Sequence, residues 1–375
     1  MTQALDAAWA RFPQAAALSA RQAQARAGVD LSRGLTPGAA SVSLNHLNDR
    51  LNQNTGRREW EIEMATPLWL PGQRRAREVV ADLVSAEVEA RGAALRLELA
   101  SEVREAWWAV AVARESTTLA RQKLATAQAL ESTVQRRFKT GDLARLDANL
   151  AKTERLAAQA EVLDADSASQ LAQQAYRVLV GLEAPTVLAP EGEAPQEVDA
   201  PHPQLRALQL AAEVARSRLA LVDASQRDAP ELAVRWSNQR SDALAPHDQA
   251  VGVKLTIPLS SGGQVRQEEA AARAELAQAE AELAQMQTRT QQNVLKAQAE
   301  WSAAQRQMGM AEERKALTAD SLQLAQRAFE VGESDLPALM RARAASQEAL
   351  AWSQRQEVAR HLALSRLHQA RGVMP

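Results

Sequence analysis

The side chains that most often bind metals or carry out acid–base chemistry are few in this chain and widely spaced. There is no cysteine, so thiolate metal sites, cysteine nucleophiles and disulfide bonds are excluded. There are five histidines in 375 residues. His361 and His368 would share a helix face but lie about 10 Å apart, too far to bind one ion together. We therefore predict no metal site.

Motifs for nucleotide binding and nucleophilic catalysis are also missing. The segment Ser260-Ser261-Gly262-Gly263 precedes a helix but lacks the Lys-Ser/Thr of a phosphate-binding loop. Neither a nucleophile elbow nor a dinucleotide-binding fingerprint occurs. With 44 basic and 46 acidic residues, the formal charge of −2 gives no general attraction for nucleic acid. We predict no enzyme activity, no cofactor and no nucleic-acid partner.

The composition favours long, packed helices. Apolar residues make up 46% of the chain but aromatic residues only 3%, which is typical of helical bundles rather than of a bulky globular core. No run of about 18 uninterrupted apolar residues occurs, so we expect no transmembrane helix. Residues 1–11 lack a basic segment followed by an apolar one, so we expect an export signal to be absent from this chain.

The two halves of the chain match each other at a nearly constant offset, which is the strongest signal in the sequence. The offset of 191 residues persists from the first matched prolines to a pair of glycines far downstream. The matched pairs include Pro67 with Pro258, Gly72 with Gly263, Gln73 with Gln264, Val103 with Val294, Arg136 with Arg327, Phe138 with Phe329, and Gly141 with Gly332. We predict two structural repeats, residues 1–190 and 191–375.

Each repeat reads as a helix, a β-hairpin and a very long helical hairpin. Alternating apolar and polar residues predict hairpins near 40–68 and 230–259. The following helices run without proline for roughly 70 residues, a rod of about 100 Å, and end at the tip glycines Gly141 and Gly332, which can reverse the chain. Heptad spacing with small residues predicts close, coiled-coil-like packing, as at Leu276, Leu283, Thr290 and Ala297.

The returning helices are shorter than the outgoing ones, so each needs a second helix stacked on its end. The arm from Asp142 to Val180 would be completed by the helix over residues 203–228. By the same reasoning, the C-terminal helix from Leu336 to Ala370 would be completed by the N-terminal helix, residues 4–34. A proline-rich linker, residues 181–201, would join the halves.

This duplicated plan resembles the TolC, or outer-membrane efflux protein, family over essentially the whole chain. The resemblance rests on the strand-to-helix junctions TPLWLPGQRRARE and IPLSSGGQVRQEE and on the tips RRFKTGDLARLD and RAFEVGESDLPAL. It implies a mainly α fold with a small β part: a homotrimer with a twelve-stranded β-barrel in the lipid of the outer membrane, continued by a periplasmic α-barrel.

The resemblance further implies a passive exit duct of a tripartite efflux system in a Gram-negative cell. Such a duct conducts small substrates, metal cations or drugs, from an inner-membrane pump of the resistance-nodulation-division type and a periplasmic adaptor, or membrane fusion, protein. The junction PLWLPGQRRARE favours the heavy-metal cation branch. Two other classes are weighed against it. The heptads alone would suffice for a soluble or surface coiled-coil scaffold, and a membrane-tubulating helical protein would need a basic amphipathic face that this near-neutral chain lacks.

The resemblance also assigns roles around the tip glycines. It implies adaptor docking at Arg136, Phe138, Gly141, Leu143, Arg327, Phe329, Gly332 and Ser334. The family tends to place acidic side chains at the periplasmic constriction, where rings of charge select cations. The gate and selectivity candidates are Asp142, Asp147, Glu333 and Asp335. The alternative is that the glycines only cap helices and the acids only favour helix N-termini.

Overall fold

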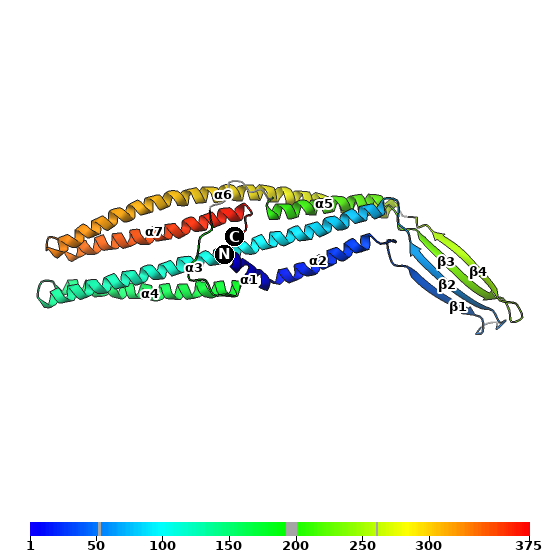
Figure 1. Ribbon diagram of the computed structural model, residues 1–375, viewed down its shortest axis with the longest axis horizontal. Coiled ribbons are helices and arrows are strands. Elements are labelled where there is room, and N and C mark those ends of the chain that lie inside the picture. The colour runs from blue at the N-terminus through cyan, green and yellow to red at the C-terminus, as the bar shows by residue number, and fades with distance from the viewer. Residues whose placement is uncertain (52–53, 193–200, 260–261) are drawn as a thin grey trace. The chain divides into compact units, whose positions relative to one another are not determined.

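The computed structural model describes residues 1–51, 54–192, 201–259 and 262–375. The remaining residues, which include part of the first strand turn, part of the proline-rich linker with Pro195, and Ser260-Ser261 of the second junction, lie outside the described residues. The described residues form seven helices and four strands (Figure 1). They are α1 (Thr2–Arg11), α2 (Pro13–Ser32), β1 (Ser41–Asn48), β2 (Arg58–Pro67), α3 (Gln73–Lys139), α4 (Arg145–Val180), α5 (Pro203–Ala224), β3 (Glu231–Arg240), β4 (Asp248–Thr256), α6 (Gly262–Glu330) and α7 (Leu336–Ala370).

The prediction of a mainly helical chain with a small β part is confirmed. The predicted N-terminal helix over residues 4–34 is instead two helices, α1 and α2. The break falls at Phe12, whose extended backbone (ψ 118°) suits a residue before proline, and Pro13 opens the second helix. Among the described residues, none of the helices combines the length and apolar character needed to cross a membrane.

The chain divides into two compact units that each combine segments of both halves. One unit holds residues 1–15, 93–203 and 287–375, and the other holds residues 16–92 and 204–286. The repeats, 1–190 and 191–375, are defined by sequence similarity, whereas the compact units are defined by packing in space. The division into repeats stays a prediction.

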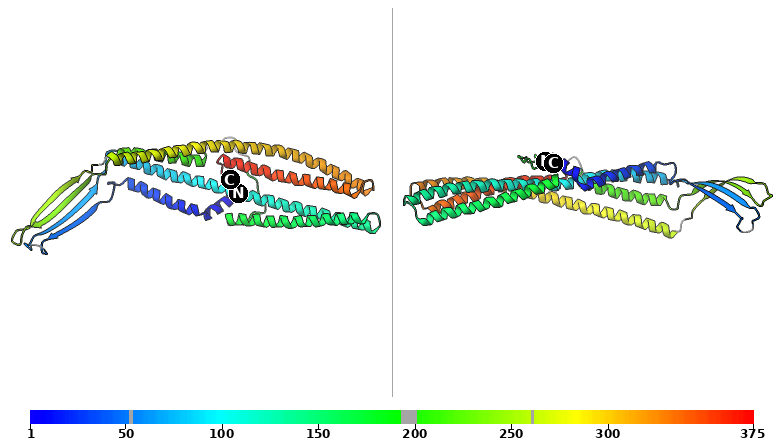
Figure 2. Two further views of the ribbon diagram at one scale, coloured as in Figure 1. Left: turned by 180° about the vertical axis from the view of Figure 1, so that it is seen from behind. Right: turned by 90° about the horizontal axis from the view of Figure 1, so that it is seen from below.

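In the first unit, four helices lie side by side in the order α4, α3, α7, α6 (Figures 1 and 2), and hydrogen bonds join each neighbouring pair. The α3–α4 seam is built from small residues at heptad spacing, with Ala113, Ala120 and Ala127 buried on α3 and Ala151 and Ala158 buried on α4. Small side chains allow close approach. The approach is close enough for the Thr117 hydroxyl on α3 to donate to the Ala165 carbonyl on α4, at 3.1 Å.

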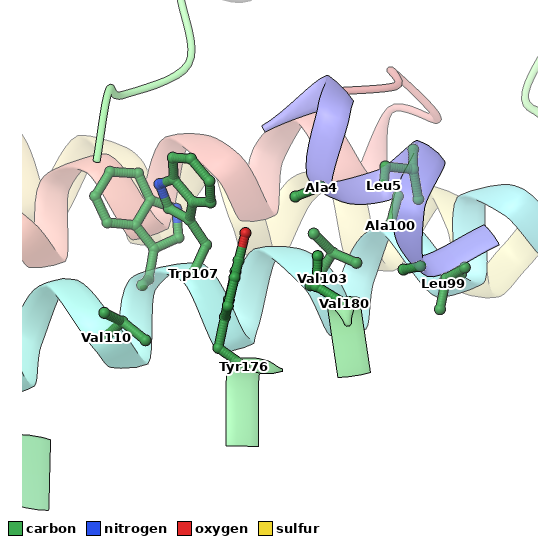
Figure 3. Packing of buried hydrophobic residues seen from close by; sticks show 11 residues of the cluster. Ala4, Leu5, Leu99, Ala100, Val103, Trp107, Val110, Tyr176 and Val180 are labelled. Atoms are coloured by element: carbon green, nitrogen blue, oxygen red, sulfur yellow. The ribbon is translucent and has the colours of Figure 1, made fainter. Parts of the chain in front are cut away.

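The core of this unit gathers large side chains where α1 meets α3 and α4. Figure 3 shows Leu5 of α1, Trp107 of α3 and Tyr176 of α4 within one cluster. The α1 helix thus packs against the C-terminal end of α4, where Val180 is fully buried. The pairing predicted from sequence, in which the N-terminal helix completes the C-terminal one, is wrong at this point. Helix lengths alone do not show whether the N-terminal helix packs against the end of α4 or the end of α7.

In the second unit, the four strands form one antiparallel sheet in the order β1-β2-β3-β4. The two hairpins are joined through the β2–β3 pair, in which Arg58 is aligned with Arg240 and Pro67 with Glu231. Each predicted strand is present. Each is longer than the stretch of alternating apolar and polar residues that predicted it, because the backbone pairing between strands extends into flanking polar residues. Within the described residues, β1 and β4 are paired on one side only.

Candidate docking site at the hairpin tips

Both hairpin tips are glycine turns with the same backbone hydrogen bonds. Gly141 and Gly332 have φ of 85° and 82°, a left-handed conformation that glycine adopts without steric cost. Gly141 donates its N–H to the Phe138 carbonyl and Asp142 to the Arg137 carbonyl. The second tip repeats this pattern 191 residues later, from Gly332 to Phe329 and from Glu333 to Ala328. This is a helix C-cap of the Schellman type.

The helix that follows each tip is capped by an aspartate, but from a different position in each hairpin. In the first, the Asp147 carboxylate accepts the N–H of Ala144, the N-cap residue, at 3.1 Å. In the second, the N-cap residue itself, Asp335, accepts the N–H of Ala338 at 2.9 Å. Ala144 and Asp335 occupy equivalent positions in the two repeats. Each hairpin thus keeps one half of a reciprocal capping box.

The two tips pack against each other through one apolar cluster. Its buried members come from the four long helices α3, α4, α6 and α7: Leu130, Val134, Ala151, Phe329, Leu336 and Leu339. Leu143, a predicted docking residue, is partly buried against this cluster. Phe329 is 5% exposed at the centre of the cluster, whereas the equivalent Phe138 is 40% exposed. Of the two predicted docking phenylalanines, only Phe138 offers a ring to a partner.

A side chain that the sequence did not single out joins the tips. The Arg137 guanidinium lies 4.8 Å from the centre of the Phe329 ring and donates to the Phe329 carbonyl at 3.4 Å. Further from the tip, Arg343 of α7 donates to the Thr126 carbonyl of α3 at 3.0 Å. Arg137 stood beside the matched pair Arg136 and Arg327, but its own equivalent is Ala328. A search for residues shared by the repeats therefore passes over it.

The remaining predicted residues lie on the surface of the tips. Arg136 and Arg327 are exposed, and Ser334 is half-buried in the second turn. The four acidic candidates divide into two kinds. Asp147 and Asp335 cap helices, as described above, and Asp142 accepts a hydrogen bond from the Thr140 hydroxyl at 2.8 Å. Glu333 is exposed. The structure thus brings the predicted residues to one end of the first unit, and their docking and gating roles stay predictions.

The helices at the two outer edges of the first unit carry exposed apolar stripes. On α4 the exposed side chains include Leu156, Leu163, Leu171 and Val178. On α6 they include Met310, Leu317 and Leu324, seven residues apart. Such spacing is typical of a helix that packs against another helix. Among the described residues, none covers either stripe.

The two faces of the sheet in the second unit have opposite character. Because side chains alternate along a strand, one face collects nearly all the large apolar residues, and they are exposed: Val42, Leu44, Trp60, Ile62, Met64, Val234, Trp236, Val251, Val253 and Leu255. The other face carries Glu59, Glu61 and Glu63 of β2. Arg235 lies 3.3 Å from Glu61, and Lys254 lies 3.7 Å from Glu63.

A buried ion pair fixes the start of the linker to the helices of the first unit. Glu191 accepts from the Arg104 Nε at 2.9 Å and lies 3.0 Å from the His368 Nδ1, and all three side chains are under 10% exposed. Burial alone would raise the pKa of Glu191, but the hydrogen bond from His368 and the charge of Arg104 outweigh it and hold that pKa below its usual range. Arg104 also donates to the Val373 carbonyl. The network ties the linker and the C-terminal segment to α3.

In the part of the chain that the structure describes, no group of three or more His, Asp or Glu side chains is placed so that it could hold a metal ion. The chemistry that these surfaces offer is packing, ion pairing and hydrogen bonding at exposed edges and tips.

Comparisons with known proteins agree on one kind of protein. Residues 194–373 match the family model described as "Outer membrane efflux protein". The cobalt-zinc-cadmium resistance protein CzcC of Cupriavidus metallidurans is 27% identical over 211 residues, which cover 54% of this chain and 50% of CzcC. The chain thus spans about half the length of this curated relative.

Solved structures share the fold over nearly the whole chain. The outer membrane protein VceC from Vibrio cholerae has a TM-score of 0.76 at 18% identity, covering 99% of this chain and 96% of VceC. CusC, described with its conformational changes during folding and transmembrane channel formation, has a TM-score of 0.80 at 16% identity, covering 99% and 92%.

Proposed function

Because residues 194–373 match the outer membrane efflux protein family, we propose that this chain is the outer-membrane exit duct of a tripartite efflux system, with a large periplasmic extension. It conducts passively and is not an enzyme, as membership of a channel family implies. An inner-membrane pump supplies the energy, and a periplasmic adaptor protein connects the two.

The observation that carries this proposal is the two-faced sheet. An exposed apolar face of four strands needs an apolar surrounding, and the opposite face, with glutamates paired to Arg235 and Lys254, suits water. Outer-membrane strands alternate in this way between lipid and lumen. A coiled-coil scaffold would leave such a sheet without a role.

The proposed trimer is supported by strand edges that the described residues of one chain leave unpaired. The outer sides of β1 and β4 would pair with those of neighbouring copies, which gives the twelve strands expected from the sequence. The apolar stripes on α4 and α6 lie at opposite edges of the four-helix layer, so α4 of one copy would pack against α6 of the next. Three repeats of a head-to-tail contact close a ring.

Adaptor docking is proposed at the exposed parts of the two tips. Phe138, Arg136 and Arg327 offer an aromatic ring and two cations to a partner. Phe329 and Leu143 support this surface from within the tip cluster. Gly141 and Gly332 shape the turns, and a side chain added there would meet no atom within 4 Å.

Gate and selectivity roles are proposed mainly for Asp142 and Glu333, whose side chains are exposed next to the tip glycines. Asp147 and Asp335 add negative charge at the same end of the unit while capping their helices. In a trimer these residues form rings that favour cations. Neutralising Asp142 and Glu333 should reduce cation selectivity without unfolding the tips, because neither residue is a helix cap.

Metal cations are proposed as the substrates. The support is the likeness to a protein that confers resistance to cobalt, zinc and cadmium and the acidic residues at the tips. An inner-membrane pump of the resistance-nodulation-division type would deliver them. A strain that loses resistance to these metals, but not to drugs, when the chain is deleted would support this substrate class; the reverse pattern would contradict it.

Cysteine cross-linking tests the assembly, because the chain has no cysteine of its own. Leu163 on α4 and Met310 on α6 both lie 22 residues from their tip glycines, Gly141 and Gly332. The double variant L163C/M310C should form covalent trimers on oxidation in the outer membrane. Each single variant is the matched control and should stay monomeric on a denaturing gel. Monomers alone from the double variant would contradict the α4–α6 contact.

A further inference from the structure

Charged residues of the four strands are segregated between the two faces of the sheet. All five strand carboxylates, from Glu59, Glu61, Glu63, Glu231 and Asp248, share the polar face by strand alternation and register. The four strand cations divide equally. Arg235 and Lys254 lie on the polar face, each with a glutamate partner, whereas Arg58 and Arg240 lie on the apolar face.

Arg58 and Arg240 are directly opposite each other in the β2–β3 register. Two like charges in such a cross-strand pair repel each other. No carboxylate among the described residues forms an ion pair with either side chain, although Arg57, next in the chain, reaches Glu59. Arg240 is held in place because its Nε and Nη2 donate to the Gly56 carbonyl, at 3.4 and 3.3 Å. The remaining guanidinium donors of both residues are available for an anion.

The pair stands at one end of the apolar face, beside the strand turns. Along β3, Arg240 lies eight residues from Leu232, which is about 27 Å of strand. The apolar band of outer-membrane strands is about 25 Å tall. The row just inside the arginines is amphipathic: His46 stacks on Trp60 with ring centres 4.0 Å apart, and Asn238 pairs with Trp60 in the register. Aromatic residues of this kind mark the boundary between hydrocarbon and headgroups.

We propose that Arg58 and Arg240 together bind the phosphate of an anionic lipid headgroup in the outer leaflet. The proposal rests on the proposed function, which sets the apolar face against lipid with the strand turns outward. A phosphate between the two guanidinium groups would relieve their repulsion and accept charge-assisted hydrogen bonds from both. Acyl chains of the same lipid would lie along Ile62, Trp236 and their neighbours.

Quenching of tryptophan fluorescence by brominated lipids tests this site, since Trp60 and Trp236 share the apolar face. The full chain is reconstituted into phosphatidylcholine vesicles that contain either brominated phosphatidylglycerol, which is anionic, or brominated phosphatidylcholine, which is not. We expect the wild type to favour the anionic lipid by about tenfold in relative binding constant. The R58Q/R240Q variant should lose this preference.

The matched control is R235Q/K254Q, which removes the same charge from β3 and β4 on the opposite face of the same sheet. It should keep the preference. Quenching that is equal for both lipids in the wild type, or a preference kept by R58Q/R240Q, would overturn the lipid site while leaving the channel intact. A preference abolished by inorganic phosphate in the buffer would assign the arginines to a soluble anion and also overturn it. Absence of quenching by either lipid would instead contradict the membrane-facing sheet, and with it the proposed function.

Discussion

The two hairpin tips share one backbone turn but secure it with different side chains. Glycine conformation and hydrogen-bond pattern repeat at the same offset, yet the first tip exposes its phenylalanine and the second buries it. The caps differ in the same way, with an aspartate at the third helical position in one hairpin and at the N-cap in the other. The two turns share one backbone conformation, which favours glycine in both, while their packing and capping side chains come from different positions.

The largest expected difference between the tips concerns the two phenylalanines. Phe329→Ala removes a buried ring from the tip cluster and should lower the free energy of local unfolding by about 3 kcal/mol. Phe138→Ala removes an exposed ring and should cost under about 1 kcal/mol. Hydrogen exchange of the tip amides in both variants measures this difference. Equal losses would mean that the tips are packed alike.

The glycines should behave alike, in contrast to the phenylalanines. Gly141→Ala and Gly332→Ala each force a side chain into the left-handed region and should cost about 1–2 kcal/mol. Gly309→Ala is the matched control, because Gly309 lies within α6 with no neighbour close to an added Cβ. It should stabilise the helix by up to about 1 kcal/mol. Thermal unfolding of the three variants compares them, and a clear difference between the two tip variants would break the backbone equivalence.

Restoring the missing half of a capping box sharpens the comparison of the caps. Ala144→Ser supplies an N-cap hydroxyl opposite Asp147 and should add about 1 kcal/mol to the stability of the first tip. Asp335→Ala should remove a similar amount from the second tip, because the N–H of Ala338 loses its acceptor. Urea denaturation followed at each tip measures both. A destabilising Ala144→Ser would show that the first cap does not depend on the N-cap side chain.

The smallest effect is expected at the contact between the tips. Arg137→Ala removes a cation from the Phe329 ring and should cost about 0.5–1 kcal/mol. Arg136→Ala, next in the chain but exposed, is the control and should change stability by less than about 0.5 kcal/mol. Hydrogen exchange at Phe329 and its neighbours distinguishes them. If Arg136→Ala had the larger effect, the ring contact would not be what joins the tips.

Much of the fold could be predicted from hydrophobic periodicity and from the positions of glycine and proline. The tip glycines, the α7 bounds and the two strand hairpins follow from local rules about glycine, proline and alternation. The N-terminal helix, residues 4–34, was predicted as one piece, although Pro13 starts a new helix. Its partner was assigned wrongly because helix lengths do not show which helix packs on which. The cluster that Leu5 shares with Tyr176 and Val180 is formed by tertiary packing.

The candidate site could be located from sequence but not resolved into roles. Matching the repeats finds Phe138 and Phe329 as equivalents and cannot show that one is buried. The same matching does not identify Arg137, because Arg137 acts through its contact with the Phe329 ring of the other tip. Asp147 and Asp335 seemed alike as acidic residues near a glycine. Their separate capping geometries depend on where each helix begins.

The most direct test of the channel is the oligomeric mass and planar-bilayer conductance of the protein extracted in detergent from the outer membrane. A trimer with small, cation-selective conductance, larger after neutralisation of Asp142, Asp147, Glu333 and Asp335 together, is the predicted result. A monomer or dimer that conducts no ions would contradict the proposed exit duct.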